Sequence, residues 1–216
     1  MKYKAALFDF DYTLGDATAS IFEGYCYGFE KMGYPRPELE AVRHTVGYIL
    51  EDGFTMITGE SGEAKRREFR AWFQEKVEGR QAELTKLFPG AEELLRALHA
   101  QGVKVGVVTS KRATTLRDIL RRYELLDLMA VTIGGEMVKF PKPDPEGLNT
   151  AIAELGVEKG EVLYCGDTVI DAGTAQNAGV DFSAVLNGTT PAGEFEKFPY
   201  VHIAPDLVEL KSWLEI

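Results

Sequence analysis

Short apolar runs alternate with segments of helical periodicity along most of the chain. The runs lie at residues 5–8, 103–108, 130–133, 162–165 and 182–186, with a shorter one at 201–203. Apolar runs bounded by polar residues are typical of strands buried inside a parallel sheet. Apolar residues spaced three and four apart predict helices at 91–101, 114–123, 148–155, 172–177 and 207–214. Strands that alternate with helices in this way predict an α/β fold built on a parallel sheet.

The segment between residues 17 and 83 shows helical patterns without an interrupting strand pattern. Its first apolar stripe recurs every four residues and predicts an amphipathic helix that ends at Gly33. That stripe consists of Ala17, Ile21, Tyr25 and Phe29. Further helical patterns follow at 48–57 and 63–82. Because the segment leaves from the end of the first strand, we expect a helical domain, residues 16–83, inserted over a core formed by residues 1–15 and 84–216.

Composition and net charge limit the kinds of molecule that this protein is expected to bind. The 216 residues are 45% hydrophobic and 27% charged, which is an ordinary globular balance. The net charge of −10 argues against a nucleic acid or an anionic membrane as partner. The first apolar run is too short for a signal peptide or a membrane span, so we expect a cytoplasmic protein. Cys26 and Cys165 show no metal-ligand spacing. A monomer and a homodimer both remain open.

Residues whose side chains can act in catalysis or bind a metal gather where the predicted strands end. They are Asp9 and Asp11 after the first strand, Thr109 and Ser110 after the second, Lys142 in the loop after the third, and Asp167 and Asp171 after the fourth. Each feature alone has a structural explanation, such as a turn, a surface loop or a helix N-cap. However, the carboxyl ends of parallel strands face one crevice. Burying several carboxylates together is costly unless a cation neutralises them or they serve in catalysis. The sequence therefore predicts a single catalytic or metal-binding site at these strand ends.

These motifs, in this order, resemble those of the haloacid dehalogenase superfamily of phosphohydrolases. Asp9-Phe10-Asp11-Tyr12-Thr13-Leu14 resembles the first motif, DxDxT, and Thr109 and Lys142 resemble the second and third. The segment Gly166-Asp167-Thr168-Val169-Ile170-Asp171 resembles the fourth motif, GDxxxD. The resemblance covers nearly the whole chain and is strongest to phosphoglycolate-phosphatase-like members. It implies a Rossmann-like parallel sheet core with an inserted α-helical cap.

The resemblance also implies a reaction, in which Mg²⁺ assists hydrolysis of a small phosphorylated metabolite. Asp9 is then the nucleophile that forms an aspartyl-phosphate, and Asp11 is the acid and base. A dehalogenase attacks carbon, and its halide leaving group needs no proton, so Asp11 favours phosphate chemistry. Thr109 and Lys142 are expected to contact the phosphoryl group.

The metal ligands and their support follow from the same resemblance. Mg²⁺ is expected on the Asp9 side chain, the Asp11 backbone carbonyl and Asp167. Asp171 is expected to support the metal through water or to orient nearby groups. Mg²⁺ prefers oxygen ligands and keeps several waters, so this small set is sufficient.

Five further residues are candidates for binding phosphate or substrate. Tyr12 either shapes the leaving-group pocket or packs under the cap, and its backbone N–H is a candidate phosphate donor. Ser110 and Lys111 follow the second strand and are expected to bind the phosphate or add positive charge. Arg43 is a candidate for binding a substrate carboxylate, and His44 for binding a hydroxyl. For Arg43 and Lys111, a solvated surface charge is the competing interpretation.

Two other functions compete with a phosphatase that acts on a phosphoglycolate-like ester. A phosphomutase of the β-phosphoglucomutase type uses the same residues and returns an isomer instead of free phosphate. A non-catalytic binding module keeps the fold and loses turnover. The complete set of motif residues argues against that last alternative.

Overall fold

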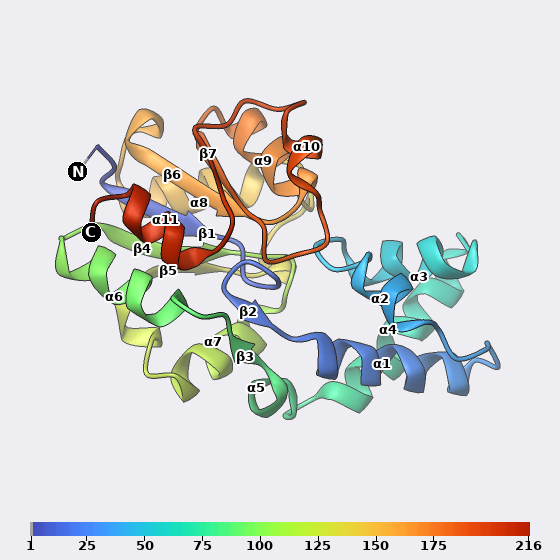
Figure 1. The fold of residues 1–216 in the computed structure, drawn as a ribbon. Helices are drawn as coiled ribbons and strands as arrows, with labels where there is room; N and C mark the ends of the chain where they lie inside the picture. Colours follow the sequence, from blue (N-terminus) through green and yellow to red (C-terminus); the bar gives the residue numbers. More distant parts are fainter. Residues whose placement is uncertain (1) are drawn as a thin grey trace.

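A six-stranded parallel sheet flanked by helices forms one side of the protein (Figure 1). The computed structural model describes residues 2–216. The strand order is β5-β4-β1-β6-β7-β8, and each neighbouring pair is parallel. The strands are β1 (Ala5–Phe8), β4 (Lys104–Val108), β5 (Met129–Ile133), β6 (Val162–Gly166), β7 (Asp181–Val185) and β8 (His202–Ala204). The prediction of a parallel α/β sheet is confirmed, and every apolar run in the sequence forms one of these strands.

Helices cover both faces of the sheet, which explains why the strands are apolar throughout. Ala6 and Phe8 pack into the hydrophobic cluster of one face, and Ala5 and Leu7 pack into that of the other. The first face is covered by α6 (Ala91–Ala100), α7 (Ala113–Arg122) and α11 (Leu207–Trp213). The second is covered by α8 (Glu146–Leu155), α9 (Val169–Ala178) and α10 (Ala192–Phe195). Short 3-10 turns occur at Leu126–Leu128, Gly135–Met137 and Lys159–Glu161.

Four helices form a second layer with a hydrophobic cluster of its own. They are α1 (Thr18–Lys31), α2 (Leu39–Arg43), α3 (Leu50–Thr58) and α4 (Glu63–Val77), and we call them the cap (Figure 1). Two glycines allow α1 to lie close against α4, because a Cβ at Gly24 would meet the Phe73 ring at 2.5 Å and one at Gly28 would meet Phe69 at 2.8 Å. Phe54 stacks on Phe69 with ring centroids 4.7 Å apart. The cap is therefore held together mainly by aromatic packing.

The helix predicted over residues 63–82 is in fact two helices. The first, α4, ends at Val77, and the chain then turns at Gly79, whose φ of +69° is a conformation that glycine adopts without strain. The second, α5 (Gln81–Leu84), packs against α7 of the sheet layer. Arg122 fixes α5 there by donating to the carbonyl oxygens of Ala82 and Glu83 at 2.6 and 2.7 Å.

Two connections join the cap to the sheet layer, and they run side by side. They pair as the antiparallel strands β2 (Gly15–Asp16) and β3 (Lys86–Leu87), which are too short to leave a pattern in the sequence. The backbone N–H of Thr18 donates to Asp16 Oδ1 at 2.8 Å at the start of α1. This pairing places the cap beside the carboxyl ends of the sheet strands. Within residues 2–216, no helix combines the length and apolar character that a membrane crossing requires.

Candidate active site

The turn that follows β1 presents two carboxylates to one cavity. The backbone N–H of Asp9 donates to the carbonyl of Cys165 at 2.8 Å, which extends the pairing of β1 with β6 and holds Asp9 at the sheet edge. The chain then folds back, because the N–H groups of Leu14 and Gly15 both donate to the carbonyl of Phe10 at 2.9 and 3.0 Å. Asp9 and Asp11 both line the cavity between the cap and the sheet.

Tyr12 has a positive φ of 61°, a backbone conformation that non-glycine residues rarely adopt. Its ring is buried, and its hydroxyl lies 2.8 Å from Thr18 Oγ1 at the start of the cap. The side chain therefore packs under the cap and does not line the cavity. Strain of this kind is concentrated at functional turns, and here it accompanies the turn that carries Asp9 and Asp11.

Lys142 connects the nucleophile candidate to the fourth motif. Its Nζ lies 3.0 Å from Asp9 Oδ1 and 2.7 Å from Asp171 Oδ1, and all three side chains are buried. Burial alone would lower the pKa of Lys142, but the carboxylates of Asp171 and Asp9 raise that pKa well above its usual value. Burial raises the pKa of Asp9 to about 6, against the opposing effect of Lys142. Lys142 therefore keeps its positive charge beside Asp9.

Asp171 has a structural role at the start of α9. Its backbone N–H donates to Thr168 Oγ1 at 3.2 Å, while its Oδ2 accepts from the N–H and hydroxyl of Thr168 at 3.1 and 2.6 Å. This reciprocal capping satisfies N–H groups that the first helical turn leaves free. A Cβ at Gly166 would lie 2.3 Å from that of Asp171, so only glycine fits there. Because both Asp171 oxygens have partners, this residue orients Lys142 and the helix.

Asp167 supplies an oxygen that lacks a partner. It is 1% exposed, and its Oδ1 accepts a hydrogen bond from Thr13 Oγ1 at 3.0 Å. Its Oδ2 is buried and has no hydrogen-bond partner among the described residues. A Cβ at Gly188 would lie 2.0 Å from this oxygen, so the glycine keeps the space beside it free. Burial and the neighbouring carboxylates of Asp171 and Asp9 raise the pKa of Asp167 well above its usual value.

The carboxylates fit a metal ion. Asp9, Asp167 and Asp171 each place one carboxylate oxygen within 4.8 Å of the others. A buried oxygen without a partner destabilises the protein by roughly 1–3 kcal/mol, or more when it is charged. A cation bound to Asp9 and to the unpartnered Oδ2 of Asp167 would remove that penalty and offset the mutual repulsion of the carboxylates. This buried cluster is therefore a candidate site for a metal ion.

The loop after β4 joins the cap to the sheet edge. The backbone N–H of Lys111 donates to Thr109 Oγ1 at 3.3 Å, which orients the Thr109 hydroxyl. Ser110 Oγ donates to the carbonyl of Gly47 in the cap at 3.1 Å. Lys111 Nζ forms an ion pair with Asp11 Oδ2 at 3.1 Å, so this lysine is not a solvated surface charge. Thr109, Ser110 and Lys111 all line the cavity.

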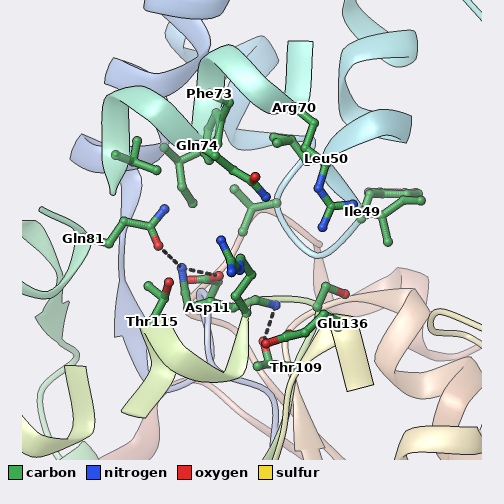
Figure 2. Close-up of a pocket in the computed structure, with 18 of the residues that line it drawn as sticks. Asp11, Ile49, Leu50, Arg70, Phe73, Gln74, Gln81, Thr109, Thr115 and Glu136 are labelled. Atoms are coloured by element: carbon green, nitrogen blue, oxygen red, sulfur yellow. Dashed lines mark hydrogen bonds and ion pairs between the residues drawn. The ribbon is translucent and has the colours of Figure 1, made fainter. Parts of the chain in front are cut away.

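The cavity has a volume of about 540 Å³, and its cap wall carries residues that the motifs did not indicate (Figure 2). Arg70 and Gln74 lie one turn apart on α4, and both line the cavity together with Phe73. Arg70 Nη1 donates to Glu51 Oε1 at 2.7 Å on the same wall. In the sequence these two residues are recognisable only as polar residues one helical turn apart, on the side opposite the apolar stripe. A pair that faces solvent shows the same spacing, so the sequence does not assign them to the site.

Comparison with known proteins agrees with this geometry. The family model described as haloacid dehalogenase-like hydrolase matches residues 6–185. The chain belongs to this family of hydrolases. A phosphoglycolate phosphatase from Cereibacter sphaeroides is 40% identical over 186 residues, which are 84% of each protein.

Two further relatives support the assignment. The pyrophosphatase PpaX from Halalkalibacterium halodurans is 27% identical over 213 residues, 97% of each protein. The crystal structure of a haloacid dehalogenase-like hydrolase from Bacteroides fragilis superposes with a TM-score of 0.93 at 37% identity, over 96% of this chain and 99% of that one. These relatives place the hydrolase with the phosphatases of its family, which act on small phosphorylated compounds and use a metal ion.

Arg43 and His44 lie away from the cavity of the hydrolase. Arg43 pairs with Glu40 at 2.9 Å, and its guanidinium lies 5.8 Å from the centre of the Tyr12 ring. His44 is exposed. Neither residue lines the cavity, so the structure does not bring them together with Asp9. Their contact with substrate stays a prediction.

Replacing Lys142 by methionine is expected to destabilise the hydrolase by about 3–5 kcal/mol. The change keeps the length of the side chain and leaves the buried carboxylates of Asp9 and Asp171 without their ammonium partner. Urea unfolding in metal-free buffer measures the loss. Lys139→Met, an exposed lysine in the same loop, is the control and should change stability by less than about 0.5 kcal/mol. A similar small change in both variants would contradict the proposed importance of the buried ion pair.

Proposed function

We propose that this phosphatase uses Mg²⁺ to hydrolyse a small phosphomonoester through an aspartyl-phosphate on Asp9, with phosphoglycolate as the leading substrate. The observation that carries the proposal is the arrangement at the sheet edge. Asp9 lies beside Lys142, and Asp11 opens onto the same cavity. The phosphoglycolate phosphatase relative at 40% identity supports the choice of substrate.

The first half of the reaction transfers the phosphoryl group to Asp9. A carboxylate oxygen of Asp9 attacks phosphorus, and the bond between phosphorus and the leaving-group oxygen breaks. Asp11 gives its proton to that departing oxygen. Because burial raises the pKa of Asp9 only to about 6, the carboxylate is mostly ionised at neutral pH and can attack.

The second half releases phosphate and restores both carboxyl groups. Water attacks phosphorus, Asp11 takes a proton from that water, and the bond between phosphorus and the Asp9 oxygen breaks. Lys142 stays beside Asp9 in both halves and offsets negative charge on the phosphoryl oxygens. The hydroxyl of Thr109 and the backbone N–H of Tyr12 are further donors for those oxygens.

Mg²⁺ would be held by the side chains of Asp9 and Asp167 and by the backbone carbonyl of Asp11. When bound, it neutralises the charge that accumulates between the phosphoryl group and these acids. The unpartnered Asp167 Oδ2 and the preference of Mg²⁺ for oxygen ligands support this assignment. Asp171 supports the site through Lys142 and Thr168.

Phosphate release from a panel of esters tests the proposal. Phosphoglycolate, pyrophosphate and hexose phosphates are each supplied with Mg²⁺, and phosphoglycolate is expected to give the highest kcat/KM, above about 10⁴ M⁻¹s⁻¹. EDTA should remove the activity, and added Mg²⁺ should restore it. A preference for pyrophosphate would overturn the substrate, and isomerisation of a hexose phosphate without free phosphate would favour the phosphomutase. Absence of turnover on every ester would overturn the function itself.

A further inference from the structure

The ammonium group of Lys111 contacts two side chains, those of Asp11 and Gln81, which are both labelled in Figure 2. Its Nζ lies 3.1 Å from Asp11 Oδ2, and it donates to Gln81 Oε1 at 3.3 Å. The side chains of Lys111 and Asp11 are only 5% and 14% exposed. An ion pair this well shielded from water is stronger than one at the surface.

The two oxygens of Asp11 are in different situations. Oδ2 is paired with Lys111, whereas Oδ1 is buried and has no hydrogen-bond partner among the described residues. Protein acceptors that are buried and unpaired are rare, and such an atom in a reaction cavity is a candidate for chemistry. The ion pair therefore holds Oδ2 in place, and it leaves Oδ1 free to react.

We infer that Lys111 is a positioning residue, which holds Asp11 Oδ2 so that Oδ1 is the oxygen that gives and takes the proton. The inference rests on the proposed role of Asp11 as acid and base. An aspartate can rotate about two side-chain bonds, and a proton transfer needs its oxygen within hydrogen-bond distance of the reacting group. One fixed oxygen determines where the other one lies.

Gln81 keeps Lys111 in that position. A lysine side chain has many rotamers, and ordering it requires more than one contact. Gln81 is buried at the start of α5, and α5 is fixed to α7 by Arg122. The second acceptor is thus on a helix that is attached to the sheet layer. Lys111 is consequently fixed at its backbone by Thr109 and at its tip by Gln81.

A substrate-binding lysine and a positioning lysine lead to different kinetics. A residue that only attracts the substrate phosphate raises KM when it is removed and leaves kcat unchanged. A residue that aligns Asp11 lowers kcat, because a misplacement of about 1 Å can reduce the rate by about 10²-fold. The effect must also appear in the second half of the reaction, where Asp11 accepts the proton of water.

Steady-state and stopped-flow kinetics with p-nitrophenyl phosphate separate these roles. The p-nitrophenolate leaving group needs no proton, so misalignment of Asp11 slows mainly the hydrolysis of the aspartyl-phosphate. For Lys111→Met, we expect kcat to fall by about 10–100-fold without a rise in KM. The burst of p-nitrophenolate should be larger than in the wild type and approach one per active site. Lys111→Arg, which keeps the charge and the donors, should recover much of kcat.

Two further variants complete the test. Arg112→Met removes the same charge from the next residue of the cavity wall, and among the described residues the ion pair of Asp11 is with Lys111 and not with Arg112. It should raise KM at most, without the enlarged burst. Gln81→Leu should give a weaker form of the Lys111→Met result, and the double variant should be less than additive.

The outcomes are decisive. A raised KM with unchanged kcat in Lys111→Met would overturn the inference and leave Lys111 as a substrate-binding residue. An unchanged burst in that variant, or the same burst in Arg112→Met, would also overturn it. In each of these cases the wild type still hydrolyses the ester, so the proposed function stands. If the wild type itself shows no turnover, the proposed function fails first.

Discussion

Asp9→Asn is expected to lower kcat by at least about 10⁴-fold, the loss typical of removing an enzyme nucleophile. The asparagine has almost the same size, so it fits the site 3.0 Å from Lys142 that Asp9 occupies. Its amide lacks the anionic oxygen that attacks phosphorus. Phosphate release under saturating substrate measures the loss. Acid quenching during turnover with ³²P-labelled substrate should leave label on the wild-type protein and none on the variant.

The stability of the Asp9→Asn variant provides the control for folding. Burial raises the pKa of Asp9 from 3.8 to about 6, so the folded state disfavours the ionised carboxylate. The resulting destabilisation is absent below about pH 4 and complete above about pH 6. In metal-free buffer the variant should therefore unfold at a higher temperature than the wild type at pH 7, with a smaller difference at pH 4.

A matched substitution at the surface tests whether the effect is specific. Asp127→Asn changes the charge equally at an exposed position in the Leu126–Leu128 turn, outside the motifs, and it should retain full activity. Activity above about one per cent of wild type in Asp9→Asn would contradict the nucleophile assignment. Label on the protein of that variant would contradict it independently.

Much of the site could be predicted because it depends on the sheet. Asp9, Thr109 and Asp167 each follow a buried strand, and parallel order brings the ends of β1, β4 and β6 together. A residue at such a position is placed by backbone pairing, which a run of apolar residues indicates in the sequence. The direction of the side chain hardly matters for that prediction.

The cap wall could not be predicted in the same way. Whether Arg70 or Arg43 faces the cavity depends on how α4 and α2 are rotated, and that rotation is set by glycine and phenylalanine packing between helices. Both arginines lie next to apolar positions and are followed or preceded by acids. Their sequence neighbourhoods are alike, and only the packed structure separates them.

Short elements show the limit of periodicity. The strands β2 and β3 contain two residues each, so no alternation can be read from them. The helix α5 follows α4 so closely that one pattern covered both, although Gly79 separates them. These elements form because the cap must leave and re-enter the sheet layer at one place, which is a property of the whole fold.

Asp11→Asn is expected to lower kcat by about 10²–10⁴-fold, the range for a lost general acid and base. The effect should depend on the leaving group. An alkoxide such as that of phosphoglycolate needs a proton as it departs, whereas p-nitrophenolate does not. With p-nitrophenyl phosphate, Asp9 should still be phosphorylated quickly, but no carboxylate remains to take the proton of water. The aspartyl-phosphate should therefore accumulate, visible as one p-nitrophenolate released rapidly per active site before slow turnover.

The two substrates together decide what Asp11 does. If Asp11 is the acid and base, the substitution slows both halves of the reaction with phosphoglycolate, so little phosphoenzyme accumulates with that substrate. With p-nitrophenyl phosphate only the second half slows, and most of the enzyme is present as phosphoenzyme. If Asp11 only supplies its backbone carbonyl to Mg²⁺, the substitution leaves that carbonyl in place, and kcat stays within a few-fold of wild type for both esters. Equal losses with both substrates and no burst would point instead to impaired attack by Asp9. The unpartnered Oδ1 of Asp11, buried at the cavity beside Lys111, is the observation that favours the first of these outcomes.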